Sequence, residues 1–170
     1  YARFAAENKA VAKMPVAKNR VVFMGNSITE GWKNTDSAFF AGRQYINRGI
    51  SGQTTPQMLL RFRPDVIDLK PAVVVILAGI NDIAGNTGPM TLEETFGNIE
   101  SMATIAKANK IKVVICSVLP AYDFPWRPGM EPAPKVIALN KMLKDYAMKN
   151  GCGYVDYFSA MADKRSGLPV

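Results

Sequence analysis

Residues 21–27 read Val-Val-Phe-Met-Gly-Asn-Ser, and this stretch decides how the rest of the chain is interpreted. Four apolar residues with high β propensity come first, and Gly25 and Asn26 end the run directly before Ser27. Residues 28–32 are typical of the opening of a helix. The sequence therefore predicts a buried strand, a tight turn and a helix, with Ser27 at the junction.

A serine in the first turn of a helix is well placed to act as a nucleophile. The first N–H groups of a helix have no intrahelical partner, and the positive end of the helix dipole lies there. Both features favour the negative charge that develops when a hydroxyl attacks an acyl carbonyl. The structural alternative for Ser27 is that it simply caps the helix.

Composition narrows the classes of function. The chain has 170 residues, of which 48% are apolar and 21% charged, as in an average soluble domain, so we expect one domain over residues 1–170. No apolar run approaches the roughly 20 residues of a membrane span. The net charge is +7, but the basic residues are scattered without interleaved aromatics, so nucleic-acid binding is not expected. Two cysteines and no histidine support neither a disulfide framework nor a metal site.

The first residue is Tyr1 rather than methionine, which suggests that a segment such as a signal peptide or a tag has been removed. We therefore expect a periplasmic or secreted location in preference to a cytoplasmic one. The oligomeric state is left open.

Apolar runs and helical patterns alternate along the chain. Strands are expected at Arg20–Met24, Gln44–Asn47, Ala72–Ala78, Lys112–Val118 and Tyr154–Phe158. Helices are expected at Thr55–Phe62, Leu92–Ala108 and Val136–Lys149, with a weaker one at Ala2–Lys13. Near-continuous Val/Ile/Leu runs indicate strands covered on both faces, and the alternation predicts a doubly wound parallel α/β domain.

Polar, glycine-rich segments follow three of the predicted strands: residues 25–27, 47–54 and 79–82. The carboxyl ends of parallel strands share one edge of a sheet, so these segments can converge. Ser27 would attack the acyl carbonyl, and the N–H groups of Ser27 and Gly52 with the side-chain amide of Asn81 would form an oxyanion hole. The structural alternatives are a turn glycine at Gly52 and a helix cap at Asn81, with Asp82 ordering the loop.

At these residues the chain resembles the SGNH hydrolases, the superfamily of GDSL-type esterases and acylhydrolases. Residues 23–29, 47–52 and 79–82 match its first three blocks, with Asn26 where aspartate is most common. The resemblance extends from about Arg20 to Phe158. It implies a flavodoxin-like three-layer α/β/α sandwich with a five-stranded parallel sheet of order 2-1-3-4-5. It also implies ester hydrolysis through an acyl-serine intermediate, without a metal or other cofactor.

One block of that superfamily, Asp-x-x-His, has no match here. Asp163 is followed by Lys164, Arg165 and Ser166, and the chain has no histidine. We expect the chain to be truncated just before this block, and the 170 residues alone to be poorly active. The alternative is a non-catalytic ligand-binding relative or an inactive fragment. A flavin or nucleotide binder is a weaker alternative because the first loop lacks G-x-G-x-x-G and a P-loop lysine.

The resemblance favours a small-molecule ester with a short acyl group, acetyl above all, and carbohydrate O-acetyl esters in particular. No residue of the sequence specifies that substrate. Tyr122 and Trp126, in a proline-rich loop after the fourth strand, are candidates to line the substrate site or simply to pack. Trp32, about one turn after Ser27, is a third candidate with the same two readings.

Overall fold

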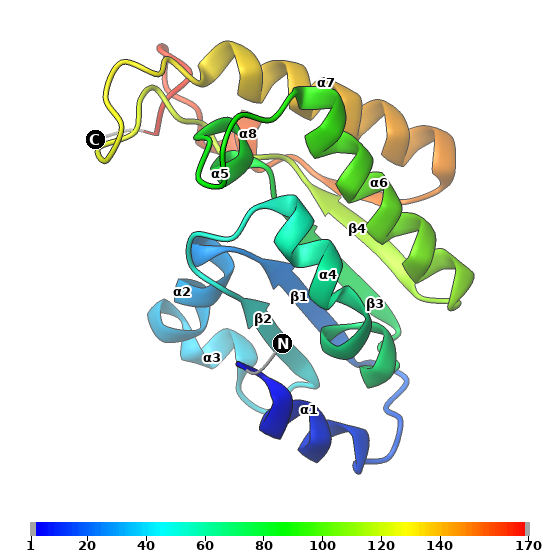
Figure 1. The fold of residues 1–170 in the computed structure, drawn as a ribbon. Coiled ribbons are helices and arrows are strands. Elements are labelled where there is room, and N and C mark those ends of the chain that lie inside the picture. The colour runs from blue at the N-terminus through cyan, green and yellow to red at the C-terminus, as the bar shows by residue number, and fades with distance from the viewer. Residues whose placement is uncertain (1–2, 169–170) are drawn as a thin grey trace.

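The computed structural model describes residues 3–168, and its centre is one parallel β-sheet (Figure 1). In the described residues the sheet has five strands in the order β2-β1-β3-β4-β5. They are β1 (Val21–Gly25), β2 (Tyr45–Gly49), β3 (Val73–Leu77), β4 (Lys112–Cys116) and β5 (Gly153–Val155). The predicted parallel sheet of order 2-1-3-4-5 is confirmed.

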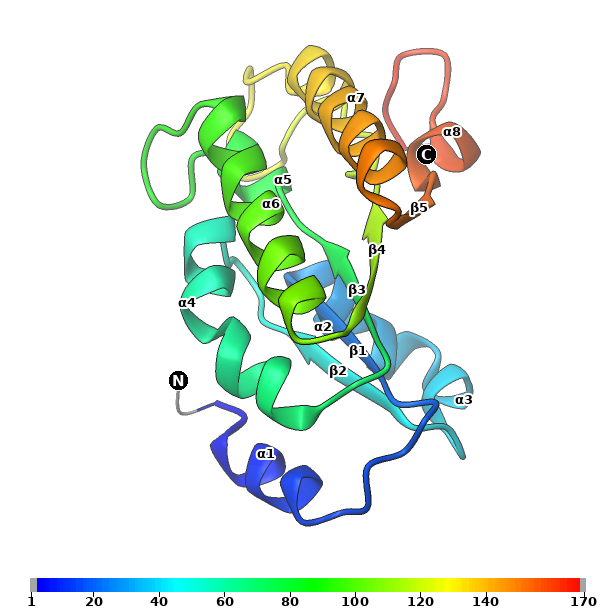
Figure 2. The ribbon, with the colours of Figure 1, turned by 90° about the vertical axis from the view of Figure 1, so that its right-hand side faces the viewer.

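Helices cover both faces of the sheet, which gives the predicted three-layer α/β/α sandwich (Figure 2). One layer holds α4, α6 and α7, with α1 at its edge. The other holds α2 and α3, and α8 lies close to β5. The helices are α1 (Ala5–Ala12), α2 (Ser27–Thr35), α3 (Ser37–Phe40), α4 (Thr55–Asp65), α5 (Ile80–Ile83), α6 (Leu92–Ala108), α7 (Ala133–Asn150) and α8 (Tyr157–Met161), with a 3-10 turn η1 (Ile67–Leu69).

The core lies between the sheet and the layer of α4, α6 and α7. Alternate strand residues such as Val74 and Ile76 are almost fully buried there. From the helices, Met58, Phe62 and Leu139 pack against them. These residues come from the Val/Ile/Leu runs and helical stripes of the sequence, because an element buries the side chains that its periodicity places on one face.

Several helix ends follow their local sequence. The predicted helix Leu92–Ala108 is α6 itself, and Thr91 and Glu94 form a capping box at its start. Helix α7 begins three residues before the predicted Val136 and ends at Asn150, where Gly151 follows in the left-handed conformation. Helix α1 is shorter than the predicted Ala2–Lys13, and Ala2 lies outside the described residues.

The predicted strand Tyr154–Phe158 is wrong over its second half. Strand β5 ends at Val155, and helix α8 begins at Tyr157. Asp156 causes the change, because its carboxylate accepts hydrogen bonds from the backbone N–H and the hydroxyl of Ser159. An aspartate at this position caps a helix and ends the strand.

The strands that carry the three polar segments end at one level of the sheet. Gly25 is paired with Gly49 of β2 on one side and with Leu77 of β3 on the other. Gly49 also lies directly against the first turn of α2, where a Cβ would be 2.1 Å from the backbone nitrogen of Glu30. This close approach fixes the helix that begins at Ser27.

We expect Gly49→Ala to destabilise the fold by about 1–3 kcal/mol, because the added methyl group overlaps backbone atoms that have no rotamer to adopt. The matched control is Gly97→Ala within α6, where a Cβ meets no atom within 4 Å. That change should stabilise by about 0.5–1 kcal/mol through helix propensity. Urea denaturation measures both values, and equal effects of the two substitutions would contradict the close approach at Gly49.

Candidate active site

Ser27 is the first residue of α2 and is exposed at the carboxyl end of β1. Asn26 caps the helix: it is almost fully buried, and its side-chain oxygen accepts the backbone N–H of Ile28 at 3.1 Å. Asn26 therefore makes the capping hydrogen bond that an aspartate would make at this position, but it carries no negative charge. Because Asn26 provides the cap, the Ser27 hydroxyl is not needed for that purpose.

Gly52 has a φ of +77°, which side chains other than glycine rarely adopt. A Cβ at Gly52 would meet no atom within 4 Å, so the backbone angle, not close packing, requires glycine there. The residue is exposed in the loop between β2 and α4. Its carbonyl oxygen accepts a hydrogen bond from the side-chain amide of Asn86 at 3.4 Å.

Asn81 lies in the short helix α5 after β3 and is buried. Its side-chain amide nitrogen donates to the backbone carbonyl of Gln53 at 2.9 Å. This bond joins the third polar segment to the residue next to Gly52. An amide nitrogen carries two hydrogens, so Asn81 keeps a second donor for a ligand.

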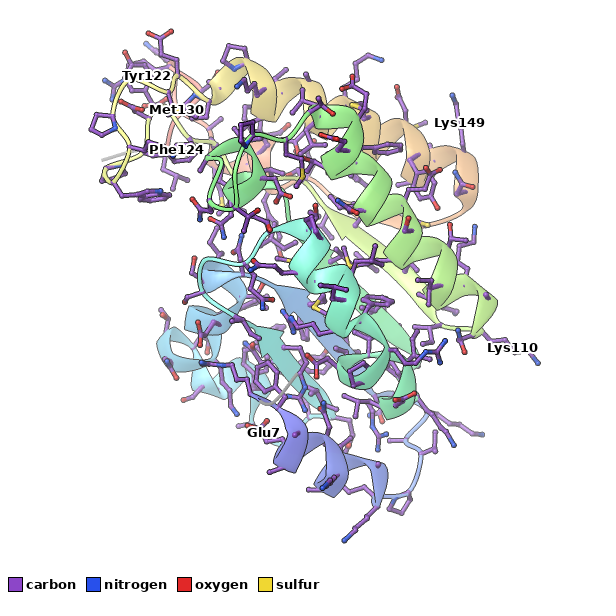
Figure 3. The ribbon with its side chains drawn as sticks, in the orientation of Figure 1. Glu7, Lys110, Tyr122, Phe124, Met130 and Lys149 are labelled. Carbon is purple, nitrogen blue, oxygen red and sulfur yellow. The ribbon has the colours of Figure 1, made fainter. Side chains whose placement is uncertain are left out.

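Ser27 and Asn81 line one cleft of about 720 Å³, together with the loop between β4 and α7. Figure 3 shows Tyr122, Phe124 and Met130 gathered in that loop. Tyr122 and Trp126 line the cleft with 55% and 62% of their surface exposed, and Trp126 stacks on the buried Phe124 with ring centroids 5.1 Å apart. The structure thus brings the serine, the asparagine and an aromatic surface together, and Gly52 sits at the neighbouring loop.

Comparison with known proteins identifies the family. Residues 23–169 match the model of the GDSL-like Lipase/Acylhydrolase family. The chain belongs to this family. A GDSL-like lipase from Bacteroides thetaiotaomicron VPI-5482 is 54% identical in sequence, and its crystal structure superposes with a TM-score of 0.93 over 98% of this chain and 82% of that one.

Two more distant similarities were found. An acetyl xylan esterase from Geobacillus stearothermophilus has the same fold, with a TM-score of 0.65 and 20% identity over 91% of this chain and 90% of that one. The lipoprotein YqeF of Bacillus subtilis (strain 168) is 35% identical over 81 residues. That match covers 46% of this chain and only a third of the lipoprotein's length.

In this GDSL-like family member, Trp32 packs among other aromatic side chains and does not line the cleft; these were the two roles considered for it. Its ring stacks on Phe39 at 4.5 Å and meets Phe23 and Phe40 edge to face. Trp32 is not among the cleft-lining residues of the described chain. The cluster explains this placement, because α2 and α3 bury their aromatic side chains together against β1.

Asp123 is the only carboxylate on the cleft wall within residues 3–168, and it is engaged as a hydrogen-bond acceptor. It accepts the backbone N–H groups of Phe124, Gly129 and Met130. The Gly129 bond, followed by the Phe124 bond, holds the pKa of Asp123 below its usual range. Asp123 therefore shapes the aromatic loop and is a weak candidate for a general base.

Burial excludes the Cys116 thiol as a nucleophile. Burial raises the pKa of the Cys116 thiol to about 12, so it stays protonated and unreactive at neutral pH. Within the described residues, no cluster of histidine, cysteine or carboxylate side chains could hold a metal ion. None of the helices over the same residues is both long and apolar enough to cross a membrane.

Two buried side chains tie the segments together; the sequence indicated a loop-ordering role for Asp82 but gave no role to Arg61. Arg61 of α4 hydrogen-bonds to Gln53 and to the backbone at the ends of β1 and β2. Asp82 accepts the backbone N–H and the hydroxyl of Thr55 at the start of α4. The signal available for Arg61 was its place beside Phe62, on the stripe that buries Met58.

Asp82 should make stability depend on pH. Burial raises its pKa, although the bonds from Thr55 oppose the shift. Above the unfolded-state pKa of about 3.9, the folded protein retains a proton that the unfolded chain has lost. The free energy of unfolding therefore falls as the pH rises through the folded-state pKa of Asp82. We expect Asp82→Asn to remove this fall when urea denaturation is followed from pH 4 to 7.

Asp145→Asn is the control, since a hydrogen bond from Lys141 lowers the pKa of this exposed carboxylate. The contribution of Asp145 is present above the unfolded-state pKa and is lost as the pH falls, which is the opposite sign. Parallel pH profiles for the wild type and Asp82→Asn would contradict the role given to Asp82.

Proposed function

We propose that this chain is a serine esterase that cleaves small esters of short acyl groups, with acetyl esters of carbohydrates as the preferred class. The observation that carries the proposal is the placement of Ser27, at a helix N-terminus, in one cleft with Asn81. Membership of the GDSL-like lipase/acylhydrolase family supports hydrolase chemistry.

The proposed reaction has two steps. Ser27 Oγ attacks the acyl carbon, its proton is lost, and the carbonyl oxygen becomes an oxyanion that the N–H groups of Ser27 and Gly52 and the amide of Asn81 stabilise. The bond to the leaving alcohol then breaks, and the alkoxide takes up a proton. Water attacks the acyl-serine in the second step, which releases the acid and restores the hydroxyl.

The 170 residues offer little to accept the proton that the Ser27 hydroxyl must lose. The chain has no histidine, and Asp123 is held by three backbone N–H groups. The hydroxyl proton would therefore pass to water or hydroxide. We expect slow turnover that rises with pH, about 10³–10⁴-fold above the uncatalysed reaction, as in serine enzymes that have lost a triad member.

Three features support the proposed substrate. The cleft wall is formed largely by apolar and aromatic side chains, and the exposed face of Trp126 can pack against the C–H face of a sugar ring. An acetyl xylan esterase has the same fold. A location outside the cytoplasm, which fits an extracellular carbohydrate, is supported by the similarity to a lipoprotein.

We expect Ser27→Ala to abolish the hydrolysis of p-nitrophenyl acetate above the buffer rate while the circular dichroism spectrum stays unchanged, because the exposed hydroxyl makes no structural contact that the fold needs. Release of nitrophenol, followed between pH 6 and 9, measures the rate. If the mutant and the wild-type chain hydrolyse the ester equally, the nucleophile is misassigned and a binding role takes precedence.

Asn81→Ala tests the oxyanion hole separately. Loss of one donor should lower kcat by about 10²–10³ with a smaller effect on KM, because the donor acts mainly in the transition state. Asn34→Ala, on the exposed surface of α2, is the control and should keep the wild-type kcat. A rise in KM with unchanged kcat would show that Asn81 only binds the ground state.

A further inference from the structure

The guanidinium group of Arg61 bonds to two of the three site segments, residues 25–27 and 47–54. Arg61 is 4% exposed and donates to four acceptors. Its Nη2 atom donates to the carbonyl of Gly25 at 3.2 Å and to that of Arg48 at 2.9 Å. Its Nε atom donates to the side-chain oxygen of Gln53 at 2.6 Å, and Nη1 donates to Asp65 at 2.9 Å.

Two of these contacts lie close to residues of the proposed site. Gly25 stands two positions before Ser27, and Gln53 directly follows Gly52. Gln53 also accepts the amide of Asn81 through its backbone carbonyl at 2.9 Å. One side chain therefore reaches the nucleophile segment directly, and it reaches the other two proposed oxyanion donors, Gly52 and Asn81, through Gln53.

The charge of Arg61 is compensated within the same network. Asp65, one turn later on α4, is also buried, and its second oxygen accepts the side-chain amide of Asn8 at 2.6 Å. Burial lowers the pKa of Arg61, and the bond to Asp65 opposes that shift. A planar group with several fixed donors suits four acceptors in different segments, which an ammonium group cannot match.

We propose that Arg61 is a positioning residue that sets the oxyanion hole against Ser27 by orienting Gln53. This inference rests on the proposed function. A purely structural role for Arg61 would stabilise the strand ends without affecting the placement of Asn81. The side chain of Gln53 separates the two cases, because it links Arg61 to the loop but is itself only half-buried.

The test compares Gln53→Met with Gln53→Glu. Methionine keeps the length of the side chain and removes the acceptor, whereas glutamate keeps an oxygen for Arg61 Nε. With p-nitrophenyl acetate, we expect Gln53→Met to lower the Ser27-dependent kcat about tenfold or more at unchanged KM, since small misplacements of catalytic groups cause losses of this size. Gln53→Glu should restore most of the rate. Arg61→Lys should act like Gln53→Met, and Arg63→Lys, at an exposed position of α4, should have no effect.

A second measurement does not depend on catalysis. In ¹H–¹⁵N spectra, Gln53→Met and Arg61→Lys should shift the side-chain amide signals of Asn81 and speed the exchange of the Gln53 amide, which donates to the carbonyl of Ile50, by about tenfold. Gln53→Glu and Arg63→Lys should leave them unchanged. Unaltered Asn81 signals, or a loss of thermal stability with kcat retained, would overturn the inference. If the wild type shows no Ser27-dependent hydrolysis, the proposed function fails and the spectra alone decide the role of Arg61.

Discussion

Strands β1, β2 and β3 end side by side at the same edge of the sheet, and the rest of the site depends on this constraint. Parallel pairing sets Gly25 beside Gly49 and Leu77, so the segments that follow leave the sheet side by side. Backbone hydrogen bonds fix this register, and a slip of one residue would turn every buried side chain to the opposite face. The geometry around Ser27 is thus a consequence of the sheet, and the absence of a side chain at Gly49 lets α2 approach closely enough to share it.

Buried polar side chains add hydrogen bonds between the segments that the strand register has brought together. Asn81, Asp82 and Arg61 are buried and each bonds to another segment of the chain. Buried polar groups are costly unless they are satisfied, so a network of this kind favours one arrangement of its loops. The aromatic loop is built differently, around Asp123 and a hydrogen bond from Arg127 to the carbonyl of Ala84. Hydrogen bonds between segments therefore hold the surroundings of the proposed catalytic residues, while the aromatic residues that line the cleft lie on an exposed loop, as binding residues often do on a stable scaffold.

The sequence predicted the features that depend on local patterns. The strand order, α6 and its capping box follow from apolar runs, the family resemblance and the spacing of Thr91 and Glu94. It could not predict the contacts of Arg61 or of Asp82, because these depend on which loops the fold brings together. The same limit explains Trp32, whose distance from Ser27 along the helix is compatible with the cleft and with the aromatic cluster. At Asp156, a helix cap prevailed over the β propensity of the residues around it.

These observations separate two parts of the proposed catalysis: the placement of Ser27 and Asn81, and the transfer of the proton from the serine hydroxyl. The register and the buried polar network place Ser27 and Asn81 without any contribution from a histidine, since the chain contains none. Electrostatic stabilisation is usually the largest contribution to acyl-transfer catalysis, and it requires donors that are in place before the reaction. A general base adds to that stabilisation, but it need not share the same structural support. The proposed oxyanion hole can therefore be studied apart from the base, through the residues that the sheet holds in place.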